Sequence, residues 1–234
     1  MTLVLVAHGS ADPRAALQTR ALARAVGGVA AFLDHAGPRP ASVLRDLSLA
    51  GHRSAVVVPL LLTSAYHGRV DLPAALAGLE LDVALADVLG PVDGVVPPEL
   101  LDALALRLGS ALRSSGSYDG LVLAAAGTRD ADARETVSLS ARALGERLGV
   151  PCTAAFATSD GMRPAEAVAR LRAAGARRVA MSAYFLAPGK LYDLAAAGAR
   201  GAGAVAVTRP LGASPDLARL VRRRAASARV LVPA

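Results

Sequence analysis

The sequence predicts an α/β protein made of two duplicated lobes, each with a doubly wound parallel sheet, that face a central cleft. Short apolar runs of strand length alternate with longer segments whose apolar residues recur at helical spacing. This alternation is typical of parallel strands joined by helical crossovers. The same pattern starts again near residue 121, which indicates a duplication. With 234 residues, the chain is long enough for one large domain or two small ones.

Four strand signals alternate with four helix signals in the first half. Five consecutive apolar residues at 3–7 predict a strand buried on both faces. Asp12 and Pro13 then supply a helix N-cap and a first helical residue, and Gly27 follows the last apolar position. By the same criteria we predict further strands at 29–33, 54–62 and 81–89, and helices at 12–26, 40–51, 68–79 and 97–112.

The second half repeats this order. Residues 121–130 parallel residues 3–12, and Pro164 begins a helix as Pro40 does. The Ser-Ser-Gly-Ser segment at 114–117 has the composition of a linker, so the predicted lobes span 1–116 and 117–234. Further strands are predicted at 154–156, 179–186 and 203–208, and helices at 164–175 and 215–228.

The composition favours a protein of the cytoplasm that does not enter a membrane. Apolar residues make up 53% of the chain, yet no apolar run reaches the roughly 18 residues of a membrane span. The first residues are too few, and lack the basic flank, for a signal peptide. Cys152 is the single cysteine, so the sequence offers no disulfide framework and no CxxC metal site.

The net charge of +7 is unevenly distributed. Residues 1–117 contain nine basic and ten acidic side chains, whereas 118–234 contain seventeen and nine. A basic excess suits nucleic acid, an anionic membrane or a polyanionic small molecule. The sequence has no zinc-finger spacing and no aromatic-rich strip, which argues against nucleic acid. The alternative is a solvated arginine-rich surface without a partner.

His8 is the first candidate for chemistry, because it follows the first strand where ligands bind in open α/β sheets. Gly9 would let a ligand approach the backbone closely. His67 follows the third strand and Asp34 the second. If the strand order is 2-1-3-4, these three side chains converge at one edge. The alternatives are a hydrogen-bonded polar histidine at a strand end, an exposed turn at Asp34-His35, and a packing role for Tyr66.

Two imidazoles and a carboxylate suit proton transfer and weak metal binding. Imidazole has the side-chain pKa nearest neutrality, so it can accept a proton at pH 7 or bind a borderline divalent metal. A set of two histidines and one carboxylate, without thiolate, leaves coordination positions open. Such a site fits a metal that is handed on, whereas a structural zinc site would be closed by four ligands.

Several of these segments together resemble the sirohydrochlorin chelatases, class II tetrapyrrole chelatases of cobalamin and sirohaem biosynthesis. The resemblance is carried by residues 6–14, by 58–62 leading to His67 and 70–73, and by 184–189 in a second copy. It covers nearly the whole chain. It implies a lyase that inserts Co²⁺ or Fe²⁺, with Ni²⁺ as a further candidate, into sirohydrochlorin without ATP or an organic cofactor.

The resemblance also implies roles for individual residues. The two metal-handling and catalytic histidines of the family fall on His8 and His67, and its usual glutamate falls on the shorter Asp34. Ala126 and Leu191 stand at the corresponding positions of the second copy, which implies one active site, built by the first half and roofed by the second. The chain would then be a monomer with an internal pseudo-twofold axis. The expected substrate contacts are Gly9, Ser10, Arg14, Tyr66 and Arg69.

Two other functions stay open at this point. A phosphoester hydrolase with a histidine nucleophile would also carry His8-Gly9 at a strand end, although an arginine normally precedes that histidine and Ala7 stands there. A non-catalytic tetrapyrrole or metal carrier would fit the degenerate second half. Retention of both His8 and His67 argues against such a carrier.

Overall fold

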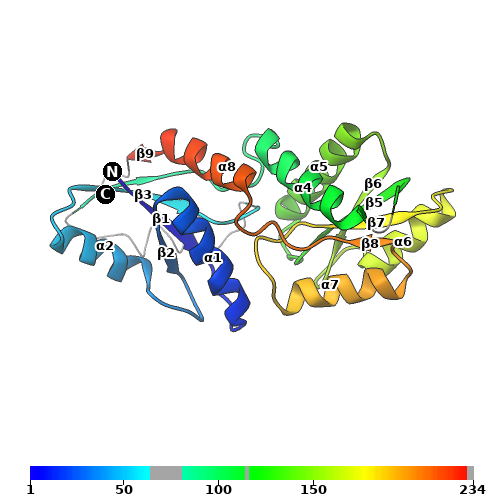
Figure 1. Ribbon diagram of the computed structural model, residues 1–234, viewed down its shortest axis with the longest axis horizontal. Helices are drawn as coiled ribbons and strands as arrows, with labels where there is room; N and C mark the ends of the chain where they lie inside the picture. The colour runs from blue at the N-terminus through cyan, green and yellow to red at the C-terminus, as the bar shows by residue number, and fades with distance from the viewer. Residues whose placement is uncertain (64–80, 114–115, 231–234) are drawn as a thin grey trace. The chain divides into compact units, whose positions relative to one another are not determined.

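The computed structural model describes residues 1–63, 81–113 and 116–230, and it contains two separate sheets (Figure 1). Among the described strands, all pairs are parallel except the pair of β4 with β9. This arrangement confirms the predicted duplicated α/β fold, including the 2-1-3-4 strand order. The first sheet has the order β2 (Val29–Phe32), β1 (Thr2–Ala7), β3 (Ser54–Pro59), β4 (Asp82–Leu85) and β9 (Arg229–Val230). The second has the order β6 (Cys152–Phe156), β5 (Gly120–Ala125), β7 (Val179–Ala183) and β8 (Ala206–Val207).

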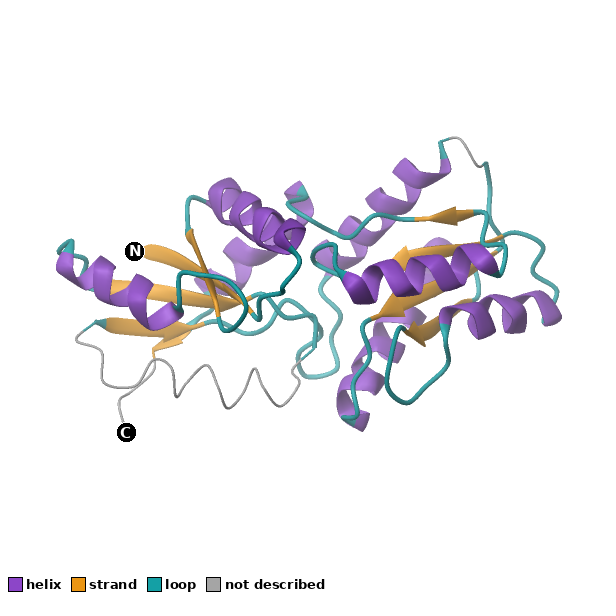
Figure 2. Ribbon diagram, turned by 90° about the horizontal axis from the view of Figure 1, so that it is seen from below, coloured by secondary structure: helices purple, strands orange, loops and turns teal. Residues whose placement is uncertain are grey.

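Helices cover both faces of the second sheet (Figure 2). Because both faces are covered, all six residues of the central strand β5 are buried, as the continuous apolar runs predict. The helices of this part are α4 (Pro98–Leu112), α5 (Ala131–Leu148), α6 (Pro164–Ala173) and α7 (Lys190–Gly201). Those that pack on the first sheet are α1 (Pro13–Val26), α2 (Pro40–Leu49) and α8 (Pro215–Ala226).

The helix signals of the sequence are confirmed where the structure describes them. The Asp12 carboxylate accepts a hydrogen bond from Arg14 N at 2.9 Å, and Gly27 ends α1 in the left-handed conformation with φ 72°. Asp130 caps α5 in the same way, accepting from Asp132 N and Ala133 N. The helix predicted at 68–79 lies outside the described residues.

Several strands are shorter than the sequence predicts. The strands predicted at 54–62, 81–89, 179–186 and 203–208 end at Pro59, Leu85, Ala183 and Val207. The apolar runs continue because the segments after the strands are themselves buried, as Leu60, Leu89 and Tyr184 show. An apolar run therefore marks burial at these places and does not mark strand length. The antiparallel edge strand β9 gave no sequence signal.

The two sequence repeats exchange their last helices. The compact units are Met1–Val92 with Gly212–Ala234, and Asp93–Leu211. Helix α4 belongs to the first repeat but contacts α5, β7 and β8, whereas α8 belongs to the second repeat and contacts α1 and β3. The lobes expected at 1–116 and 117–234 divide the chain by its sequence repeat and stay a prediction, whereas the compact units divide the chain at other residues.

A matched pair of arginines holds the exchanged helices. Arg107 in α4 and Arg224 in α8 each stand nine residues after the proline that begins their helix. Arg107 donates from Nε and Nη2 to the Leu211 carbonyl, at 3.2 and 2.5 Å. Arg224 donates from Nη2 to the Gly90 carbonyl at 2.8 Å. Each guanidinium thus binds a backbone carbonyl in the segment that follows the last parallel strand of the sheet. It is the same sheet on which the helix of that arginine packs.

Replacing Arg224 with methionine is expected to destabilise the first unit. The side chain is only 8% exposed, and its loss leaves the buried Gly90 carbonyl without this donor. We expect the free energy of unfolding to fall by about 1–3 kcal/mol, measured by urea denaturation. The exposed Arg24 of α1 is the matched control, and Arg24→Met should change stability by no more than about 0.5 kcal/mol. Equal effects of the two substitutions would contradict this role for Arg224.

Candidate functional site at the carboxyl edge of the first sheet

Backbone hydrogen bonds bring His8 and Asp34 to adjoining positions at the carboxyl edge of the first sheet. β1 ends at Ala7, and the ladder to β2 continues through Leu33 N to the Ala7 carbonyl at 3.0 Å and Asp34 N to the His8 carbonyl at 2.7 Å. The His8 side chain is exposed. The predicted convergence of His8 and Asp34 therefore follows from the pairing of two neighbouring parallel strands.

Gly9 allows this close approach. Its φ is +98°, and a Cβ atom built there would lie 1.8 Å from the Asp34 carbonyl oxygen. Any side chain would therefore force the two loops apart, besides being strained at this φ. The absence of a side chain at Gly9 lets the neighbouring Asp34 loop pack against it, and its predicted role in ligand access stays a prediction.

The Asp34 carboxylate is held ionised. Its pKa lies below the usual range, because His35 N donates to Oδ1 at 2.8 Å and because the imidazoles of His35 and His8, when protonated, and the charge of Arg39 act in the same direction. The Asp34 side chain is exposed and also lies 3.4 Å from His35 Nε2. Asp34 thus closes an exposed turn, and its carboxylate also lies within electrostatic range of His8.

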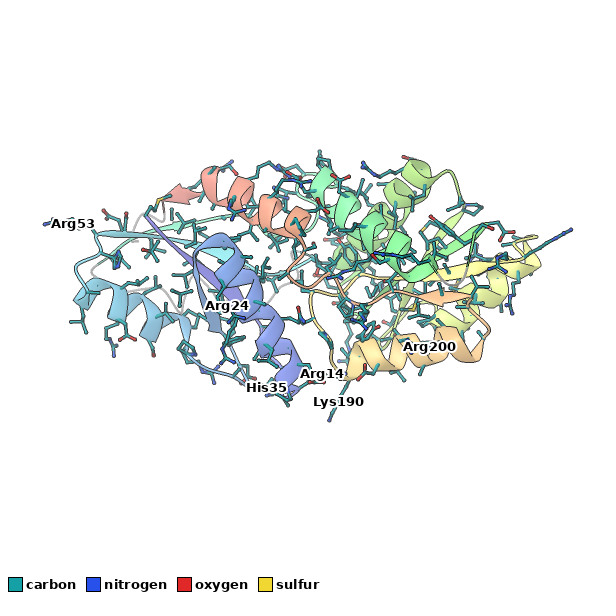
Figure 3. The ribbon with its side chains drawn as sticks, viewed as in Figure 1. Arg14, Arg24, His35, Arg53, Lys190 and Arg200 are labelled. Carbon is teal, nitrogen blue, oxygen red and sulfur yellow. The ribbon has the colours of Figure 1, made fainter. Side chains whose placement is uncertain are left out.

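Ser10 and Arg14 take part in the start of α1. Ser10 Oγ accepts from Asp12 N at 3.1 Å, and Arg14 forms an ion pair with Asp12 at 2.6 Å. The Arg14 hydrogen bonds lower the pKa of Asp12. Figure 3 places Arg14 and His35 at one end of the first unit and Arg53, which precedes β3, at the other. Ser10 and Arg14 therefore lie at the edge where the site is predicted, and their contact with substrate stays a prediction.

The second repeat keeps the backbone of this site without its chemistry. Ala126 stands at the His8 position, and its carbonyl accepts from Thr158 N at 3.0 Å. Gly127 has φ +107°, and a Cβ there would lie 2.1 Å from the Thr158 carbonyl oxygen. Thr158 is the counterpart of Asp34, and its hydroxyl donates to the Ala126 carbonyl at 3.0 Å. Thr158 was not predicted from the sequence, although its place two residues after Phe156 matches that of Asp34 after Phe32.

Part of the predicted site lies outside the described residues. This applies to the second histidine, His67, and to the predicted substrate contacts Tyr66 and Arg69. Within 1–63, 81–113 and 116–230, no group of three or more His, Cys, Asp or Glu side chains could hold a metal ion. The predicted metal set needs His67 beside His8 and Asp34, and it stays a prediction. Leu191, the predicted counterpart of His67, is 39% exposed in the first turn of α7.

Much of the arginine excess in the second half holds the backbone. Arg172 donates to the carbonyls of Ala202 and Gly203, at 2.9 and 2.7 Å, and Arg178 donates to that of Ser117 at 2.7 Å. The basic residues that follow strands of the second sheet at its carboxyl edge form a smaller set. This set is Arg129, Arg163, Lys190 and Arg209.

Among the described helices, none is long and apolar enough to cross a membrane.

Two repeats of one doubly wound sheet, with a histidine at the carboxyl edge of the first, define an internally duplicated α/β protein. The CbiX family model matches residues 2–107 and 120–228, so the chain belongs to the CbiX family. This match confirms the family resemblance found in the sequence, and it covers both repeats. None of the curated proteins matches the chain.

Three of the solved structures that match share the fold over nearly their whole length. SirB from Bacillus subtilis with Fe³⁺ has a TM-score of 0.77 and 20% identity, over 96% of this chain and 94% of that one. The sirohydrochlorin chelatase SirB from Bacillus subtilis subspecies spizizenii in complex with cobalt has a TM-score of 0.76 and 19% identity, over 97% of this chain and 94% of that one. CbiX, described as the terminal enzyme for biosynthesis of sirohaem in denitrifying bacteria, has a TM-score of 0.66 and 20% identity, over 96% of this chain and 97% of that one.

Proposed function

We propose that the chain is a sirohydrochlorin chelatase, a lyase that inserts Co²⁺ or Fe²⁺ into sirohydrochlorin without ATP. The match to the CbiX family over both repeats is the observation that carries this proposal. One solved structure of the same fold is named as the sirohydrochlorin chelatase SirB in complex with cobalt, and another is SirB with Fe³⁺. His8 is exposed at the carboxyl edge, beside an ionised Asp34. These two side chains are of the kind that the reaction needs.

Metal insertion releases two protons from the pyrrole N–H groups while the divalent ion binds the ring nitrogens. In the proposed mechanism, the His8 imidazole binds the incoming ion through a ring nitrogen or accepts one of these protons. Asp34 contributes negative charge beside it, and His67 supplies the second imidazole. A set of this kind releases the ion readily, because it lacks the thiolates and the fourth ligand of a closed structural site.

The finer parts of the proposal come from the sequence. We infer use of Ni²⁺ as a further metal, no organic cofactor, a monomeric chain and a cytoplasmic location. The central cleft and the roofing role of the second repeat belong to the same proposal. The hydrolase and carrier alternatives are not favoured, since Ala7 stands where a phosphohydrolase carries arginine and the family match points to chelation.

The test follows the absorbance of sirohydrochlorin under anaerobic conditions with Co²⁺, Fe²⁺ and Ni²⁺ in turn. We expect the protein to accelerate insertion of Co²⁺ or Fe²⁺ over the spontaneous reaction, with no ATP present. A generic phosphate ester should not be hydrolysed. The proposal is wrong if none of the three metals is inserted faster with the protein than without it.

A further inference from the structure

In the loop that follows the last parallel strand of each sheet, one position has opposite charge in the two repeats. Asp87 and Arg209 each stand two residues after the last parallel strand of their sheet. The backbone confirms that they are equivalent, because Ala86 N donates to Val57 O at 2.9 Å and Thr208 N to Met181 O at 3.0 Å. The repeats therefore place an acid and a base at the same point of the fold.

The exchanged helices give these two positions matching arginine neighbours. In the first unit, Arg224 Nη1 lies 3.9 Å from the Asp87 carboxylate. In the second unit, burial lowers the pKa of the equivalent Arg107, and the like charge of Arg209 lowers it further. Within the described parts of the chain, no carboxylate forms an ion pair with Arg107 or Arg209. The second unit thus places two cations, Arg107 and Arg209, at the positions where the first unit has the ion pair of Arg224 and Asp87.

The two arginines are positioned to receive an anion from solvent. Arg107 is fixed on the Leu211 carbonyl, two residues beyond Arg209, and the Arg209 side chain is exposed. The backbone before Arg209 is rigid, since the fully buried Thr208 accepts from Ala183 N at 2.9 Å and from the Tyr192 hydroxyl at 2.9 Å. The loop lies at the carboxyl edge, where open α/β sheets bind ligands.

We propose that Arg209 and Arg107 form a carboxylate-binding subsite on the second unit, which takes an acidic side chain of the tetrapyrrole. The identity of the ligand rests on the proposed function, because sirohydrochlorin is a polycarboxylate. Guanidinium groups suit this ligand, since they bind carboxylates through two parallel hydrogen bonds. A bound carboxylate would replace, in the second unit, the acid that Asp87 supplies in the first.

The test uses the full-length protein and measures the dissociation constant of metal-free sirohydrochlorin by absorbance titration. Arg209→Asp recreates the acid of the first repeat and should weaken binding about tenfold or more, raising KM while leaving kcat nearly unchanged. Arg209→Lys keeps the positive charge and should weaken the binding of sirohydrochlorin less than Arg209→Asp does. Arg200→Asp is the matched control, because it makes the same charge change at the far end of α7 from Lys190 (Figure 3). It should bind within about twofold of the parent.

Two further readouts separate a ligand site from a general charge effect. Affinity of the parent should fall as salt rises, and this dependence should be weaker in Arg209→Asp. The same variant should be at least as stable to urea as the parent, because it removes the repulsion of Arg107. Parent-like affinity in Arg209→Asp, or an equal loss in Arg200→Asp, would overturn the subsite. A parent that binds sirohydrochlorin through Arg209 but inserts no metal would overturn the proposed function alone.

Discussion

Replacing Gly9 with alanine is expected to remove nearly all metal insertion and to destabilise the first unit. The new Cβ atom would lie 1.8 Å from the Asp34 carbonyl oxygen, and residues that have a side chain rarely adopt a φ of +98°. The loops that carry His8 and Asp34 must then separate. We expect a fall of about 2–4 kcal/mol in the free energy of unfolding, measured in urea, and a fall of roughly 10²-fold or more in the insertion rate.

Two glycines of the same chain are matched controls for Gly9. Gly27 has φ +72° with no atom within 4 Å of its added Cβ, so Gly27→Ala should cost about 1 kcal/mol and leave the insertion rate unchanged. Gly127 has the same close contact in the second repeat, and Gly127→Ala should destabilise the protein as Gly9→Ala does. The folded fraction of that variant should still insert metal. If Gly9→Ala behaved like Gly27→Ala, the tight pairing of the two loops would not matter for the site.

His8→Ala is expected to give the second large effect, this time on the rate alone. Loss of a positioned proton acceptor costs about 10²–10⁴ in rate. The His8 side chain is exposed, so its removal opens no core cavity and circular dichroism should stay that of the parent. The control is Ala126→Ser at the equivalent position of the second repeat, which should insert metal at close to the parent rate. Equal losses in the two variants would argue against a single site on the first repeat.

The elements that position the site could be predicted because local chemistry determines them. The run that contains Val4 and Leu5 marks a strand buried on both faces, and Asp12 and Gly27 mark the ends of the next helix. Once β1 and β2 are parallel neighbours, His8 and Asp34 must reach the same edge. Their approach therefore followed from strand order and residue position, and needed no knowledge of side-chain packing.

The exchange of α4 and α8 could not be predicted in this way. A repeat shows which segments are alike, but each helix offers a similar apolar stripe, as Leu100 and Leu104 do in α4 and Leu217 and Val221 in α8. Either sheet could cover such a stripe. The choice is made by contacts between residues far apart in sequence, such as Arg107 with Leu211, and by the loops that lead to each helix. The opposed charges of Asp87 and Arg209 gain meaning only after this exchange is known.

We propose that one site, built by the first repeat around His8 and His67, inserts the metal. The most direct test is the rate of cobalt insertion into sirohydrochlorin by the purified His8→Ala/His67→Ala double variant, with circular dichroism to confirm its fold. We predict a folded protein whose rate is at least about 10²-fold below that of the parent. A folded double variant that inserts cobalt at near the parent rate would contradict the claim and would assign the chemistry to other residues.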